Sequence, residues 1–218
     1  LKHLKEKYQD ERKTKVFNGK VGEFSDEDLI QNEPTVITIT NTGYIKRQSL
    51  NSFRTQHRGG KGIKGMTTKD EDGISQIRYA QTHDNILFFT NKGKVYQLRA
   101  FEIVESSRTS RGSAVVNLIN IEQEEHVESF ISYRTGPASR QGGKTAQNEQ
   151  KGKYIFLSTK KGTVKKTAVS EFENIRRNGI AAIKLEKGDE LAWSKLTDGS
   201  QDVILTTHDG KAIRFSEK

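Results

Sequence analysis

The chain has 218 residues, enough for one large domain or two small ones, and it is polar, with 32% hydrophobic and 30% charged residues. Because it has no cysteine and no apolar run of membrane-spanning length, the composition excludes a disulfide scaffold and predicts no membrane-spanning segment. A net charge of +9 favours an acidic polymer as partner, either nucleic acid or an anionic membrane surface.

Residues 1–33 are expected to form the end of a helix and a linker. Leu1, Leu4 and Tyr8 fall at helical spacing within the stretch 1–15, which is charged almost throughout and therefore does not read as a signal peptide. Residues 20–33 are acidic and turn-rich, as is typical of a linker. A separate domain is expected over 34–218, which carries 30 Lys/Arg against 20 Asp/Glu, a net charge of +10.

Short strands begin after this linker and repeat along the chain. Thr35–Thr40 and Tyr44–Gln48 flank the turn Asn41–Gly43, which predicts a β-hairpin. The same hairpin pattern returns around Gly93, Gly162 and Gly210, with steps of about 50 residues except before Gly162. There the Gly/Gln/Lys-rich stretch 134–153 reads as an insertion.

Further strand-like stretches lie between the hairpins, at 74–80, 114–118, 127–133, 181–184 and 191–196. Since one such unit is too small to bury its own apolar face, neighbouring units must cover one another. The sequence therefore predicts an all-β, propeller-like array of four-stranded blades, with about three complete repeats and the beginning of a fourth. Whether the array closes into a wheel stays open.

A basic turn recurs at one position of the repeat. The run 43–64 contains six Lys/Arg and no acid, and it includes the glycine-rich segment Gln56–Gly62. At the matched positions of the next two repeats, arginine precedes glycine in Arg108–Gly112 and in Arg176–Gly179. The basic residues of all three turns are candidates for contact with phosphate: Lys46, Arg47, Arg54, Arg58, Lys61, Lys64, Arg108, Arg111, Arg176 and Arg177. In a radial array, equivalent positions share one rim, so we expect a basic rim that contacts phosphate without reading bases.

The segment Gln56–Gly62 resembles the GyrA box found in the C-terminal domain of bacterial DNA gyrase A. Other stretches match that family in order, among them Ala80–Asp84, Ser110–Gly112, Lys165–Phe172 and Leu196–Val203. The resemblance implies a β-pinwheel, whose blades exchange strands, preceded by a helix leading out of a coiled-coil arm. It also implies wrapping of duplex DNA so that an ATP-driven cytoplasmic topoisomerase, completed by the rest of gyrase A and by gyrase B, introduces negative supercoils. Box function is carried over onto Gln56, Arg58, Gly59, Gly60, Lys61 and Gly62, whereas His57 stands where the family usually has Arg.

No catalytic residue, metal site or cofactor is expected in this segment, because the resemblance places the DNA-cleaving tyrosine, ATP and Mg²⁺ elsewhere in the holoenzyme. Gly142–Thr145 lacks the first glycine of a phosphate loop, since Ala138 stands there. The acidic turn Asp70–Asp72 reads as solvated. Two alternatives stay open: the equivalent C-terminal domain of topoisomerase IV, and a propeller-like protein-interaction scaffold.

Overall fold

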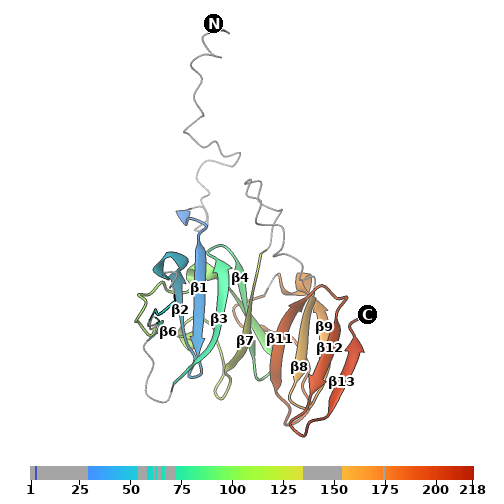
Figure 1. Cartoon of the computed structure of the whole chain (residues 1–218). Helices are drawn as coiled ribbons and strands as arrows, with labels where there is room; N and C mark the ends of the chain where they lie inside the picture. The colour runs from blue at the N-terminus through green and yellow to red at the C-terminus, as the bar shows by residue number, and fades with distance from the viewer. Residues whose placement is uncertain are drawn as a thin grey trace. The chain divides into compact units, whose positions relative to one another are not determined.

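A computed structural model describes residues 3, 29–53, 58–60, 62, 65–66, 72–134, 154–173 and 175–218. The chain divides into two compact units, Leu1–Gln31 and Asn32–Lys218. The helix and linker expected over 1–33 fall almost wholly outside the described residues, as does the expected insertion apart from Arg134. The second unit carries the fold (Figure 1).

The second unit is all-β, as predicted, and is built on four antiparallel hairpins. Each hairpin turn closes on a glycine with positive φ, Gly43, Gly93, Gly162 or Gly210. The hairpin strands are β1 (Pro34–Thr40) with β2 (Tyr44–Ser49), β4 (Asn85–Thr90) with β5 (Lys94–Arg99), β8 (Tyr154–Thr159) with β9 (Val164–Ala168), and β12 (Asp202–Thr206) with β13 (Ala212–Ser216).

The remaining strands complete the sheets, and two of them come from the following repeat. The other strands are β3 (Ile74–Gln81), β6 (Ser113–Ala114), β7 (Val127–Tyr133), β10 (Ile180–Ala181) and β11 (Leu191–Thr197). The strand orders are β3-β1-β2-β6, β10-β5-β4-β7, β11-β8-β9 and β12-β13. Strands β6 and β10 therefore each join the sheet of the preceding repeat, which is the strand exchange expected of a pinwheel.

The apolar residues form two buried clusters on either side of the second sheet. Strand β4 is buried along its whole length and alternates between them. Ile86 and Phe88 belong to the cluster shared with the first sheet, whereas Leu87 and Phe89 belong to the cluster shared with the third. The second sheet thus shares one apolar cluster with the first sheet and another with the third, and small local cores replace one deep core.

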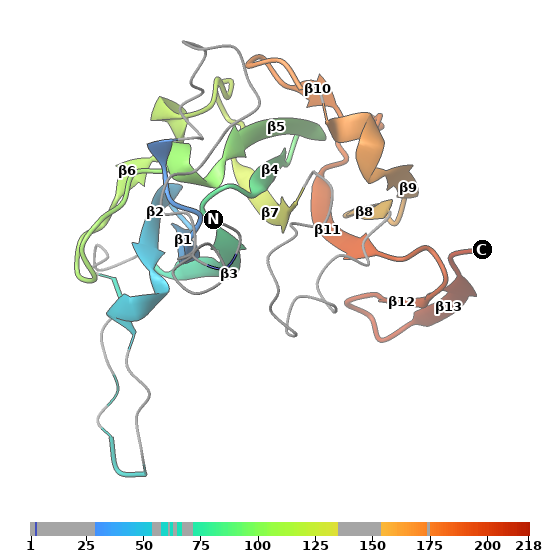
Figure 2. The ribbon, with the colours of Figure 1, turned by 90° about the horizontal axis from the view of Figure 1, so that it is seen from above.

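Each of the first two sheets has an inner and an outer edge. Strand β3 contacts β7, and β7 contacts β11, so these three edge strands line one side of the array, which we call the inner edge. Strands β6 and β10 lie at the opposite ends of their sheets, on what we call the outer edge. Figure 2 shows the sheets following an arc with β6 and β10 on its convex side.

Two of the expected strands prove shorter than predicted. The stretch 114–118 contributes only the end of β6 and then turns into the 3-10 helix η3 (Val115–Asn117), because Val115 is buried in the first cluster. The stretch 181–184 contributes only the end of β10. Further 3-10 turns follow the return strands of the first three hairpins: η1 (Leu50–Ser52), η2 (Ala100–Glu102) and η4 (Val169–Phe172). Among the described residues, no helix is long and apolar enough to cross a membrane.

Candidate nucleic-acid interface

Strand exchange places two of the predicted basic turns, Arg108–Gly112 and Arg176–Gly179, on the outer edge. The Arg108–Gly112 turn runs directly into β6, where Ser113 pairs with Ile45 of β2. The Arg176–Gly179 turn runs into β10, where Ile180 pairs with Val95 of β5. Ile45 and Val95 occupy the same position of their hairpins, so the two turns, which we call the basic turns, lie at equivalent sites on successive sheets.

The glycine that ends each basic turn is required by close backbone approach. A Cβ atom on Gly112 would lie 2.3 Å from the carbonyl oxygen of Ile45, and one on Gly179 would lie 2.9 Å from that of Val95. Both glycines also have positive φ, 81° and 69°. The Arg-to-Gly spacing seen in the sequence therefore has a geometric cause, which is docking of the turn on the neighbouring hairpin.

The arginines of the two basic turns differ in exposure. Arg176 and Arg177 are exposed, whereas Arg108 and Arg111 are half-buried. The guanidinium carbon of Arg111 lies 4.0 Å from the ring centroid of Tyr44, a cation–π contact that orients the group. Both turns thus carry arginine residues, and a guanidinium group can donate bidentate hydrogen bonds to a phosphate.

Only part of the box segment lies among the described residues. Arg58, Gly59 and Gly60 are exposed, and so is Gly62. No atom lies within 4 Å of a Cβ built on Gly59 or Gly62, so a side chain at either position would enter open space. The predicted residues Arg54, Gln56, His57, Lys61 and Lys64 fall outside the described part of the chain.

Lys46 and Arg47, expected on the DNA-contacting rim, are instead engaged inside the fold. Lys46 is fully buried, and Arg47 has a side chain only 13% exposed. The Arg47 guanidinium pairs with Glu105 at 3.1 Å and donates to the carbonyl of Ile103 at 3.2 Å. The expectation failed because these residues tie β2 to the next repeat through partners more than 50 positions away.

The Lys46 ammonium lies among four backbone carbonyl oxygens. It donates to Arg108 at 2.7 Å, to Gly65 and Ser110 at 2.9 Å, and to Ser107 at 3.3 Å. Burial, and secondarily the charge of Arg108, lowers the pKa of Lys46 below its ordinary value. This side chain therefore joins the Arg108–Gly112 turn to the segment that follows the box.

A buried acid also recurs in the first three repeats, a feature that the sequence alone did not reveal. Asp72, Glu125 and Asp189 each precede an inner-edge strand by two residues, and each is buried. Asp72 accepts from the hydroxyl and the N–H of Thr42, at 2.6 and 3.1 Å, and Asp189 accepts from the N–H of Lys161 at 3.0 Å. Asp72 is thus not the solvated residue that was expected. The shared spacing from a strand was the available signal.

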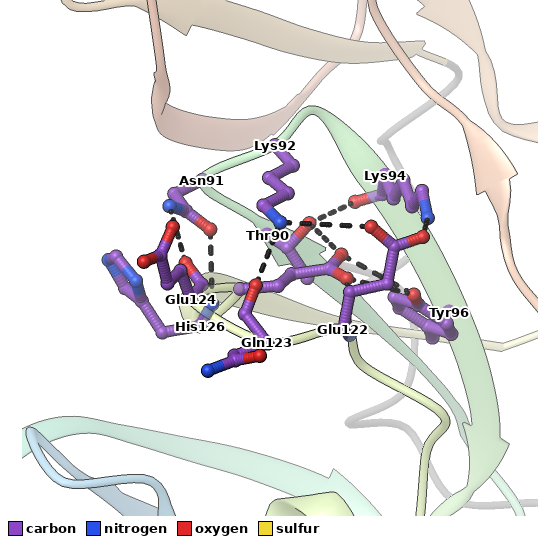
Figure 3. Close-up of polar contacts among 10 residues, drawn as sticks. Thr90, Asn91, Lys92, Lys94, Tyr96, Glu122, Gln123, Glu124 and His126 are labelled. Atoms are coloured by element: carbon purple, nitrogen blue, oxygen red, sulfur yellow. Dashed lines mark hydrogen bonds and ion pairs between the residues drawn. The ribbon is translucent and has the colours of Figure 1, made fainter.

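Figure 3 shows this junction in the second repeat. The carboxylate of Glu125 accepts from the hydroxyl of Thr90 at 2.6 Å, from the N–H of Glu122 at 2.8 Å and from the hydroxyl of Tyr96 at 3.3 Å. Burial, together with the negative charge of Glu125, raises the pKa of Tyr96 to about 12. Above this network, Lys94 pairs with Glu122 at the surface. The acid thus fastens the hairpin turn to the inner-edge strand.

The described residues contain no cluster of three or more His, Asp or Glu side chains suited to a metal ion. The features at the outer edge are cationic side chains and close-packed backbone, which can hold an anionic polymer.

Comparison with known families gives a consistent match. The family model described as "DNA gyrase C-terminal domain, beta-propeller" matches residues 34–79, 84–133, 153–198 and 201–218. The DNA gyrase A protein of Halalkalibacterium halodurans is 44% identical over 217 residues, and that of Streptococcus pyogenes serotype M3 is 42% identical. These matches cover 100% of the chain but only 24% and 25% of the relatives, so the chain spans about a quarter of their length.

Solved structures agree on the fold. The C-terminal domain of DNA topoisomerase IV superposes with a TM-score of 0.66 and 28% identity, over 86% of this chain and 53% of that one. A DNA gyrase A C-terminal domain superposes with a TM-score of 0.61 over 84% of this chain and 55% of that one, and at 24% identity it supports the fold alone.

Proposed function

The chain belongs to the family of DNA gyrase C-terminal domains, and on this basis we propose that it binds duplex DNA along the outer edge of its sheets. The observation that carries the proposal is the equivalent placement of the two basic turns at that edge. Arg108, Arg111, Arg176 and Arg177 would contact phosphate there. The box residues Gln56–Gly62, with Arg54 and Lys64 beside them, would extend the same track.

Such contacts give affinity without base recognition. Lysine and arginine at phosphates release condensed counterions, so affinity falls steeply with salt and depends little on sequence. The net charge of +10 over 34–218 supports this mode of binding. Several separated contacts along a convex edge also offset the cost of bending duplex DNA, which is of order 1–6 kcal/mol for a large bend.

We further propose that the bound DNA wraps around the outer edge and that the domain serves a holoenzyme that introduces negative supercoils. The partners in that role are the rest of gyrase A and the gyrase B protein, in the cytoplasm, with ATP and Mg²⁺ used outside this segment. The curated relatives carry the name of the gyrase A protein, which favours this role over the topoisomerase IV alternative.

A topology assay tests the wrapping proposal. Nicked circular DNA is ligated in the presence of the chain, deproteinised and resolved by gel electrophoresis with an intercalator. A directional wrap of the gyrase type leaves positively supercoiled product, while relaxed product would count against wrapping. If the chain fails to bind duplex DNA even at low salt, the protein-interaction scaffold becomes the better account.

A paired substitution in the box tests its part in the track. Arg58→Ala together with Lys61→Ala removes two charges from the box, and we expect supercoiled product to be lost while the β-sheet circular dichroism spectrum is unchanged. The matched control, Arg78→Ala with Lys195→Ala, removes two exposed charges from the inner-edge strands β3 and β11. Wrapping that survives the box substitutions would show that the track runs elsewhere.

A further inference from the structure

We propose that Lys46 is a positioning residue for DNA binding, whose buried ammonium keeps the Arg108–Gly112 turn and the segment after the box in one fixed arrangement. The proposal rests on the DNA-binding function proposed above. It assigns to Lys46 no direct contact with phosphate, because the side chain is fully buried.

The geometry around the ammonium makes its partners depend on one another. An ammonium has three N–H donors, and four carbonyl oxygens surround this one, so at least two acceptors share a proton. Three of these oxygens belong to Ser107, Arg108 and Ser110, and the fourth belongs to Gly65, which follows the box. One side chain on β2 therefore contacts two stretches that lie more than 40 residues apart in the chain.

The hydrogen bonds of Lys46 are costly to break because the ammonium is charged and buried. Burying an ammonium is expensive unless hydrogen bonds compensate it. If residues 107–110 move away, the charge loses three of its four acceptors and is poorly compensated, whereas loss of the Gly65 carbonyl alone still leaves one oxygen for each N–H. Lys46 therefore fixes the Arg108–Gly112 turn most strongly and holds Gly65 beside it. Because the Arg108 carbonyl makes the shortest of the four bonds, the coupling reaches the residue whose guanidinium would meet phosphate.

The equivalent residues of the next repeats provide an internal comparison. Tyr96 follows Gly93 by three residues, as Lys46 follows Gly43, and it lies beside Gly179 of the Arg176–Gly179 turn. Its hydroxyl donates to Glu125 and not to that turn. Lys165 holds the place in the third repeat, is exposed and donates to the carbonyl of Ala182 at 2.8 Å. The arrangement around Lys46 is thus absent at these two equivalent positions. The position itself does not require a buried ammonium.

The first experiment measures binding of the chain to a duplex DNA fragment over a range of salt concentrations. Lys46→Met keeps an unbranched side chain of similar length and removes the ammonium charge. We expect the affinity for DNA to fall about tenfold, the loss expected of one or two phosphate contacts at moderate salt. Lys195→Met, on the inner-edge strand β11, is the control for loss of one lysine and is expected to change affinity by less than about threefold. If Lys46→Met binds like the wild type, the proposal is overturned.

A double-mutant cycle separates positioning from a general loss of structure. Arg108→Ala with Arg111→Ala is made in the wild type and in the Lys46→Met chain. If Lys46 acts through these arginines, their removal weakens binding in the wild type but adds little once Lys46 is replaced. Losses that add in full would overturn the proposal. A wild-type chain that does not bind DNA overturns both this proposal and the proposed function, whereas the cycle addresses this one alone.

Chemical rescue covers the case in which Lys46→Met does not fold. Lys46→Ala leaves space for propylammonium, which restores the missing methylene groups and the ammonium. We expect propylammonium, but not the same concentration of tetramethylammonium, to restore folding and DNA affinity, since only the former can donate to the carbonyl oxygens. Equal effects of the two cations would overturn the proposal.

Discussion

Gly112 lies where the Arg108–Gly112 turn meets the backbone of β2. A substitution there measures how much the contact between the two repeats contributes to stability. Gly112→Ala is expected to destabilise the fold for two reasons. Positive φ costs a non-glycine residue about 1–2 kcal/mol, and the new methyl group would also lie 2.3 Å from the carbonyl oxygen of Ile45. The free energy of unfolding in urea measures the loss.

Gly162→Ala is the matched control for that substitution. Gly162 has a similar φ of 90°, but no atom lies within 4 Å of the added Cβ. It should therefore show the conformational cost alone, and the excess loss at Gly112 reports the close approach of the two repeats. Equal losses would mean that the turn can withdraw from β2 at no cost.

The carboxylates of Asp72 and Asp189 predict a dependence of stability on pH. Burial by itself would raise the pKa of each, but hydrogen bonds, from Thr42 to Asp72 and from Thr159 to Asp189, bring each pKa below its ordinary value. A carboxyl whose folded pKa is lowered stabilises the fold above the unfolded pKa of about 4, and this contribution is lost as the pH falls through the folded value. The urea midpoint should thus change little between pH 7 and pH 5 and fall below pH 4.

Replacing both carboxylates assigns that acid transition. Asp72→Asn with Asp189→Asn should lower stability near neutral pH and make the fall below pH 4 shallower. Asp209→Asn is the control, because the Asp209 side chain is 84% exposed at the fourth hairpin turn. A double variant with the same acid fall as the wild type would place the transition on other groups.

At the scale of elements, the joint between each of the first three hairpin turns and its inner-edge strand contains one buried acid. Thr90→Val keeps the shape of the side chain but removes the closest donor to Glu125, at 2.6 Å. The carboxylate keeps the N–H of Glu122 and the hydroxyl of Tyr96, so the expected loss is that of one hydrogen bond to a buried carboxylate, about 1–3 kcal/mol, measured by chemical unfolding. Thr207→Val at the equivalent, exposed position should stay within about 0.5 kcal/mol, and a similar loss at both would argue against the role of the acid.

The hairpins were predictable from the sequence, whereas the contacts between repeats were not. The hairpins β1–β2 and β4–β5 were predictable because alternation and a turn glycine are local signals. The sequence predicts Lys46 on the surface, because its acceptors are carbonyl oxygens of residues 107–110 and no residue near Lys46 in the chain indicates them. Asp72 was assigned to solvent for a related reason, since its partner Thr42 lies 30 residues earlier. Hydrogen-bond partners that lie far away in the chain leave no signal in the local sequence.

At the scale of the whole unit Asn32–Lys218, the arc of sheets places the two basic turns along one edge. Strand exchange carries each basic turn back onto the preceding sheet, and β6 and β10, the strands that follow the two turns, both lie on the outer edge (Figure 2). The inner-edge strands also expose charge, with Arg78 on β3 and Lys195 on β11. If DNA follows the outer edge, charges on the two edges must contribute differently to binding even though each pair removes the same net charge.

The salt dependence of duplex binding measures that difference. Each phosphate contact adds about 0.9 to the slope of log affinity against log salt. Arg176→Ala with Arg177→Ala should therefore lower the magnitude of the slope by about 2 and weaken binding on any sequence. Arg78→Ala with Lys195→Ala changes the net charge equally but should leave the slope nearly unchanged. Equal reductions by the two pairs would indicate that DNA responds to total charge and follows no particular edge.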